Sequence, residues 1–311
     1  MIKIAIAGIG GVGGYFGGLL AKYYQNSGKV QVYFIARGEN EKAIGQHGLK
    51  VETPAGNFKA TPELVTADPT QIGQVDFLIC CTKSYDLEQS LVQLKPCIGK
   101  STVILPLLNG IDSLERIKSV YPEIEVWEGC VYIVSRLTAP GLVTVTGTSD
   151  SLFFGSTEGS EAKLNLALRI FREAGVNATL SGNIQQTIWE KYSFISPVAT
   201  LTSYLDASIG AIVANPDNLE LLYSLLKELK QVAGAKGIQF PESIGQAITD
   251  KMTGLPYQAT SSMHSDYQKG KATEVDSLTG YVVRLGNQLQ IPTPTYTALY
   301  KALKNRETQS N

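Results

Sequence analysis

Short apolar runs alternate with amphipathic stretches along the first 120 residues of the chain. Continuous apolar runs are typical of buried strands, and apolar residues three or four positions apart are typical of helices. The strands predicted in this way cover residues 2–7, 30–36, 75–81 and 102–105, and helices are predicted over 39–47, 86–94 and 113–120. Strands that alternate with helices predict a parallel sheet wound by right-handed crossovers.

The pattern changes after residue 123. Strand-like runs at 126–134, 141–146 and 152–154 are separated by turn signals, and we expect them to extend the sheet, with antiparallel strands as one arrangement. A helix over 162–174 and a last strand over 176–180 follow. Earlier in the chain, residues 49–52 and 57–60 flank Pro54-Ala55-Gly56 and predict a hairpin.

Strand signals nearly vanish from residue 182 onward. The remaining helical patterns, which prolines at 197, 216, 241 and 256 break, cover 184–193, 218–236, 243–253 and 273–289. We therefore expect two domains, an α/β domain over 1–181 and an all-α domain over 182–311.

A glycine-rich turn joins the first predicted strand to a helix of small residues. The run Gly8-Ile9-Gly10-Gly11-Val12-Gly13 has the strand–turn–helix context that a dinucleotide-binding G-x-G-x-x-G requires. Gly8 suits a tight turn, Gly10 lets the backbone approach a pyrophosphate, and Gly13 lets the helix pack close to the strand. The helix N-terminus offers free N–H groups to the phosphates. We assign Gly8, Gly10, Gly11, Val12 and Gly13 to cofactor binding in a Rossmann-type, doubly wound parallel sheet, in preference to a turn that serves packing alone.

The end of the second strand bears on the choice of cofactor. An NAD-preferring site usually carries an acidic residue there for the ribose hydroxyls, whereas this strand ends in Arg37. A guanidinium forms bidentate bonds with phosphate and suits the 2′-phosphate of NADP. The arginine therefore favours NADP, while Glu39 and Glu41 keep NAD open.

Composition and charge narrow the classes of function. The 311 residues carry a net charge of −1, which gives no electrostatic case for nucleic acid or an anionic membrane. The four cysteines lack C-x-x-C spacing and are predicted to be buried thiols, and two distant histidines argue against a metal site. Glycines interrupt the one stretch that resembles a signal peptide, and no apolar run of membrane length follows. We expect a cytoplasmic protein.

Polar residues that suit redox chemistry follow two strands and recur in the helical half. Lys83 and Asn109 each come just past a strand of the α/β domain, where ligands gather. Lys191 lies on the first predicted helix of the helical half and could protonate a carbonyl oxygen as hydride reaches the carbon. Ser262 could bond a carboxylate and Glu274 a hydroxyl. Each residue also has an ordinary interpretation: a solvated lysine, a plain Asn-Gly turn, a helix cap or an exposed helix face.

Together these stretches resemble the ketopantoate reductase (2-dehydropantoate 2-reductase) family over nearly the whole chain. The matching pieces, in order, are the glycine turn, Thr82-Lys83, Asn109-Gly110, the Lys191 helix, Ser261-Ser262-Met263 with Asp266, and Thr273-Glu274-Val275-Asp276 with Gly280.

The resemblance implies reduction of ketopantoate to pantoate with NADPH in pantothenate biosynthesis, in a cleft between the two domains. Lys191 corresponds to the catalytic proton donor, and Glu274 to a glutamate that binds the substrate hydroxyl and supports catalysis. Ser262 corresponds to a serine on the substrate carboxylate. Lys83 and Asn109 correspond to residues that line the cleft, and with Glu274 we count them toward cofactor binding as well.

One departure from the family concerns the substrate. Two asparagines and a proline that the family carries after its lysine are here Ile195, Ala199 and Thr200, and Ser193 or Ser196 would have to replace the amides. The alternatives are a paralogous reductase of another 2-oxo acid and a non-catalytic NADP-binding sensor. The expected partner is a small 2-keto acid; a homodimer through the helical domain stays open.

Overall fold

The computed structural model describes residues 1–309 and divides the chain into two compact units. The first unit holds Met1–Leu108 and Ser113–Ile184, and the second holds Asn109–Asp112 and Gln185–Asn311. The four residues Asn109–Asp112, which follow a strand of the first unit in sequence, thus belong to the helical second unit.

A six-stranded parallel sheet is the centre of the first unit. Its strands, in spatial order, are β5 (Leu64–Thr66), β2 (Val30–Ile35), β1 (Ile2–Ala7), β6 (Phe77–Cys80), β7 (Val103–Pro106) and β8 (Glu125–Val126). Alternate side chains of β1 point to opposite faces of the sheet: Ile4 and Ile6 belong to one apolar core, and Ala5 and Ala7 belong to another. Burial on both faces explains why the strands are continuous apolar runs, and the predicted parallel α/β sheet is confirmed.

Helices connect the strands of this unit. They are α1 (Gly11–Tyr24), α2 (Gly38–His47), α3 (Leu87–Gln93), α4 (Ser113–Val120) and α5 (Glu161–Glu173), with short 3₁₀ turns at Pro69–Gln71, Ser84–Asp86 and Lys95–Cys97.

The glycine turn packs closely: Gly8 has φ +91°, and a Cβ on it would lie 2.9 Å from the Cys81 carbonyl. A Cβ on Gly13 would collide with the carbonyl oxygen of Gly8, so the close approach of helix and strand depends on glycine.

A second, five-stranded sheet lies in the same unit. It contains β3 (Leu49–Glu52), β4 (Phe58–Ala60), β9 (Glu128–Ala139), β10 (Leu142–Gly155) and β11 (Asn177–Leu180). The predicted hairpin of β3 and β4 is confirmed, as is the antiparallel pairing of β9 with β10. The expectation that these strands extend the first sheet is wrong except for β8, because β10 pairs with β3, β9 and β11 instead. A register shift between Thr146 and Asp150 lets one strand span two predicted runs.

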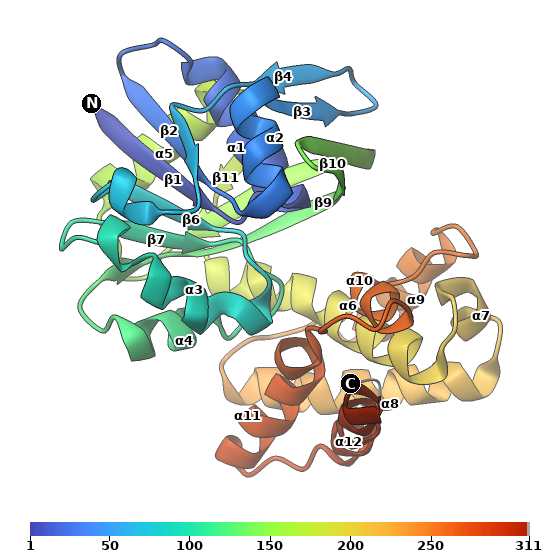
Figure 1. The fold of residues 1–311 in the computed structure, drawn as a ribbon. Helices are drawn as coiled ribbons and strands as arrows, with labels where there is room; N and C mark the ends of the chain where they lie inside the picture. The colour runs from blue at the N-terminus through green and yellow to red at the C-terminus, as the bar shows by residue number, and fades with distance from the viewer. Residues whose placement is uncertain (310–311) are drawn as a thin grey trace. The chain divides into compact units, whose positions relative to one another are not determined.

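All the secondary-structure elements in the described part of the second unit are helices, as predicted (Figure 1). It contains α6 (Ile184–Leu205), α7 (Ile209–Val213), α8 (Pro216–Ala235), α9 (Ile244–Thr253), α10 (Ser262–Gln268), a π-helical turn at Asp276–Gly280, α11 (Tyr281–Leu289) and α12 (Pro294–Gln309). One apolar core joins them.

Helix α6 does not end before Pro197, so the predicted break is wrong. The residues that follow the proline, Val198, Ala199 and Leu201, are buried in the helical core, and this packing outweighs the lost backbone bond. Among residues 1–309, no helix is both long enough and apolar enough to cross a bilayer.

Candidate active site

A pocket of about 320 Å³ opens beside the glycine turn of the α/β unit. Four predicted cofactor or substrate residues line it, namely Gly8, Gly10, Arg37 and Lys83. The parallel strands β1, β2 and β6 all end at this pocket, which is where an open α/β sheet binds ligands.

The start of α1 has the features that a pyrophosphate site needs. Gly10 is the N-cap residue and has no side chain to cap the helix. The first helical N–H groups, which include those of Gly11, Val12 and Gly13, have no acceptor within the helix. A Cβ on Gly10 would meet nothing within 4 Å, so there is open space above the turn. Thr82 Oγ1, on the pocket wall, is buried and has no hydrogen-bond partner among the described residues. These observations fit a bound dinucleotide.

Arg37 is exposed at the N-cap of α2, and its guanidinium donates to the side chain of Gln93, another residue that lines the pocket.

Sequence reasoning missed Asn40, which also lines the pocket. Its amide donates to Ile9 O at 2.8 Å and accepts from Gly141 N at 2.8 Å, so it joins the glycine turn to the start of β10. A polar residue inside a helical stretch gives no sequence signal of this bridging role.

The loop that carries Lys83 is held by an arginine from α4. Arg116 donates to both carboxylate oxygens of Glu88 at 2.6 Å and to Ser84 O at 2.6 Å. These bonds hold the pKa of the Glu88 carboxyl below its ordinary value. The backbone beside Lys83 is thereby fixed at the mouth of the pocket.

Three predicted residues meet in the helical unit. The Lys191 ammonium donates to Asn109 Oδ1 at 3.0 Å, and Asn109 Nδ2 lies 3.5 Å from Glu274 Oε2. The amide thus accepts from a cation on α6 and donates to a carboxylate just before the π turn. Asn109 can reach both because the segment Asn109–Asp112 packs with this unit.

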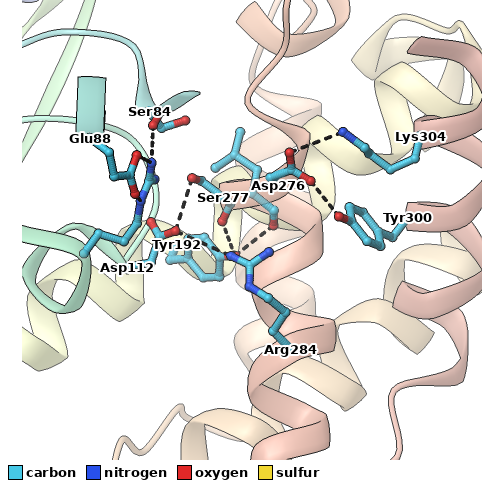
Figure 2. Close-up of polar contacts among 11 residues, drawn as sticks. Ser84, Glu88, Asp112, Tyr192, Asp276, Ser277, Arg284, Tyr300 and Lys304 are labelled. Atoms are coloured by element: carbon cyan, nitrogen blue, oxygen red, sulfur yellow. Dashed lines mark hydrogen bonds and ion pairs between the residues drawn. The ribbon is translucent and has the colours of Figure 1, made fainter. Parts of the chain in front are cut away.

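Polar contacts join Tyr192, Ser277, Asp112 and Arg284, which are neighbours of these three residues in sequence or structure (Figure 2). The single hydroxyl proton of Tyr192 is shared between the carbonyls of Ser277 and Leu278, which lie 2.9 and 2.8 Å from the phenol oxygen. Ser277 Oγ donates to Asp112 Oδ2 at 3.3 Å, and Arg284 Nη2 lies 3.6 Å from the same oxygen. Sequence reasoning missed Tyr192 and Asp112, because an apolar pattern does not distinguish a buried tyrosine that packs from one that donates a hydrogen bond.

Ser262 is the first residue of α10, and its side chain is exposed. The cap of that helix is the preceding Ser261, whose hydroxyl accepts from His264 N at 3.0 Å and shares a 2.8 Å hydrogen bond with Thr202 Oγ1. The His264 ring contacts Asp206 Oδ1 at 2.7 Å. These hydrogen bonds hold the N-terminus of α10 and therefore the backbone position of Ser262.

The structure does not support replacement of the missing family amides by nearby serines. Ser193 donates to Glu190 O at 2.7 Å and Ser196 to Leu278 O at 2.6 Å, and both side chains are buried. Ile195 is half-buried against the helical core, and Ala199 is part of that core. The helix face one turn beyond Lys191 is therefore apolar.

Comparisons with known proteins identify the same family in both halves of the chain. Residues 4–159 match the family "ApbA: Ketopantoate reductase PanE/ApbA", and residues 183–307 match "ApbA_C: Ketopantoate reductase PanE/ApbA C terminal". The chain is 37% identical to a crystal structure of 2-dehydropantoate 2-reductase from Porphyromonas gingivalis W83, with a TM-score of 0.83 and coverage of 97% of this chain and 99% of that one.

Two further likenesses bear on substrate and cofactor. "Uncharacterized oxidoreductase YkpB" of Bacillus subtilis is 29% identical, over 99% of this chain and 100% of its own length. A ternary structure of D-mandelate dehydrogenase with NADH and anilino(oxo)acetate is 25% identical, with a TM-score of 0.86 and complete coverage of both chains (100% each). One structure of this fold thus holds NADH together with the 2-oxo acid analogue anilino(oxo)acetate.

Proposed function

This chain belongs to the ketopantoate reductase PanE/ApbA family, and we propose that it reduces 2-dehydropantoate to pantoate with NADPH, a step of pantothenate biosynthesis. The observation that carries the proposal is the contact of Asn109 with both Lys191 and Glu274. Three residues that are far apart in sequence meet there as a cation, an amide and an anion.

The proposal gives each unit a separate task. The pocket at the glycine turn would hold the dinucleotide, with its pyrophosphate at the start of α1 and its 2′-phosphate on Arg37. NADPH, when bound, supplies the hydride. Ser262 would bond the substrate carboxylate, and Lys83 would line the substrate and cofactor sites.

Lys191 would act as the general acid. As the carbonyl carbon gains hydride, its oxygen develops negative charge, and the ammonium both stabilises that charge and transfers a proton to it. Asn109 fixes the ammonium at 3.0 Å from its own oxygen, which limits the directions in which Lys191 can donate. Glu274 would accept a hydrogen bond from the substrate hydroxyl.

A second candidate is reduction of a 2-keto acid that carries an apolar side chain. The observation that favours it is the apolar face at Ile195 and Ala199, together with the inward hydrogen bonds of Ser193 and Ser196. A pocket that hydrogen-bonds a substrate hydroxyl rejects the analogue without it by about 10⁴-fold or more, whereas an apolar pocket discriminates weakly.

The test is NADPH oxidation with two matched substrates, ketopantoate and 3,3-dimethyl-2-oxobutanoate, which differ only in the terminal hydroxyl. A kcat/KM about 10⁴-fold higher for ketopantoate would support the first proposal. Comparable values, or a preference for the analogue, would support the second candidate. NADPH binding without turnover of any 2-keto acid would contradict both and indicate an NADP-binding sensor.

A further inference from the structure

We propose that Tyr192 is a positioning residue for Glu274: with Ser196 it holds the π turn at Asp276–Gly280, and this turn directs Glu274 toward Asn109 and Lys191. The inference rests on the roles proposed for Lys191 and Glu274. It adds a residue that would touch neither substrate nor cofactor.

The turn itself is an uncommon element. π-helical turns are rare, occur mostly as single widened turns, and are frequent at functional sites. This one begins two residues after Glu274 and leads directly into α11. Since an α-helix turns by about 100° per residue, a change from a π to an α turn would rotate the preceding backbone about the α11 axis by roughly that angle. The carboxylate of Glu274 would then point away from Asn109.

Hydroxyl groups from α6 bond to the carbonyls of the π turn. The Tyr192 hydroxyl lies 2.9 Å from Ser277 O and 2.8 Å from Leu278 O, as Figure 2 shows for Ser277. Ser196 Oγ donates to Leu278 O at 2.6 Å and is 2.8 Å from Tyr296 Oη. The serine has one proton, which Leu278 O receives, so Tyr296 is the donor in the second contact.

Water cannot take over these bonds. Tyr192 and Ser196 are each 0% exposed, and a buried carbonyl that loses its donor destabilises the arrangement that buries it. Burial also raises the pKa of the Tyr192 hydroxyl well above its usual range, so the phenol keeps its proton and remains a donor.

Ser277 connects the three segments of the candidate site. Its carbonyl accepts from Tyr192, the residue after Lys191, and its hydroxyl donates to Asp112, three residues after Asn109. Ser277 itself lies three residues after Glu274. Any movement of the π turn is therefore passed to all three predicted site residues, and Tyr192 is the link to the helix that carries Lys191.

The test is the variant Tyr192→Phe, which removes one hydroxyl and keeps the ring. We expect its crystal structure to show an α turn in place of the π turn, or a Glu274 Oε2–Asn109 Nδ2 separation well beyond the 3.5 Å of the wild type. We expect kcat to fall about 10- to 100-fold, because small misplacements of catalytic groups have effects of that size. KM for NADPH should stay unchanged and the solvent isotope effect on kcat should rise, which a general loss of folding would not produce.

Tyr24→Phe is the matched control. Tyr24 is also a buried tyrosine with a hydrogen-bonded hydroxyl, which donates to Glu173 Oε2 at 3.0 Å and lies 3.2 Å from Ile170 O, but it belongs to the α/β unit. It should lower thermal stability and leave kcat unchanged; an equal loss of kcat in both variants would overturn the proposal.

The crystal structure decides the inference independently of activity. If Tyr192→Phe keeps both the π turn and the Glu274–Asn109 contact, the proposal is wrong whatever the rate of turnover. If the wild type reduces no 2-keto acid, the proposed function fails, and the geometry of the variant still decides the role of Tyr192. Should Tyr192→Phe not fold, Ser196→Ala removes the neighbouring donor to the same turn and is read in the same way.

Discussion

Replacing Asn109 with alanine removes the amide that joins Lys191 to Glu274. The bond from the Lys191 ammonium is 3.0 Å long and involves a charged donor, so it contributes about 1.5–3 kcal/mol. The contact with Glu274, at 3.5 Å, is at the limit of a hydrogen bond, and we assign it no contribution. If the transition state loses the first bond entirely, kcat/KM should fall about 10- to 150-fold, because 1.36 kcal/mol corresponds to a factor of ten.

The assay is steady-state NADPH oxidation with saturating cofactor and varied 2-keto acid. Asn177→Ala is a suitable control, since its side chain makes an exposed hydrogen bond of 3.0 Å to Ser151 on the second sheet. A loss in kcat with little change in KM would locate the effect in the transition state. If Asn109→Ala had the same kcat/KM as the wild type, our account of Lys191 orientation would be refuted.

Three further predictions concern the α/β unit. Arg37→Ala should raise KM for NADPH far more than for NADH, and equal effects in a two-cofactor titration would remove Arg37 from phosphate binding. Glu88→Gln should reduce the dependence of unfolding free energy on pH. Arg116 lowers the pKa of Glu88, so its stabilisation is present above the unfolded-state pKa and lost as pH falls through the folded value. Because half of the Glu88 side chain is exposed, the ion pair should stabilise the folded protein by at most about 1 kcal/mol, measured by urea titration at several pH values. If the variant and the wild type showed the same pH dependence, Glu88 would have no such role. Burial raises the pKa of Cys80 to about 12 and of Cys97 to about 11. Both thiols should therefore react with a disulfide reagent at pH 8 only after denaturant is added, and fast labelling of either one in the native protein would contradict this prediction.

The sequence predicted those parts of the fold that local patterns determine. β6 and β7 are continuous apolar runs, and β1 is one from Ile4 onward, because both faces of the sheet are covered. Such runs can be recognised without knowledge of the fold. The glycine turn was predictable because the spacing of its glycines after an apolar strand is itself a local pattern, although the backbone atoms that crowd Gly8 belong to the distant Cys81 and Thr82.

Features that depend on distant partners were not predictable. A run of apolar residues does not say which strand it pairs with, so the second sheet was mistaken for an extension of the first. Pro197 remains inside α6 because tertiary packing compensates for it, and the π turn depends on hydroxyls some eighty residues earlier in the chain. The same holds for Asn40, whose two partners lie far away in sequence.

The candidate site divides in the same way. Residue type alone favoured ordinary interpretations of Lys191 and Glu274, and the resemblance to the ketopantoate reductase family selected these two with Asn109. The structure brings the three together. Their catalytic roles, the binding roles of Ser262 and Lys83, and a homodimer through the helical unit stay predictions.

The most direct test of the central claim is the turnover of Lys191→Ala at saturating NADPH and 2-keto acid, with NADPH binding measured on the same sample by fluorescence. We predict a fall in kcat of about 10²- to 10⁴-fold, the usual contribution of a general acid, with an unchanged dissociation constant for NADPH. A variant that binds NADPH normally and turns over at the wild-type rate would contradict the assignment of Lys191 as the proton donor.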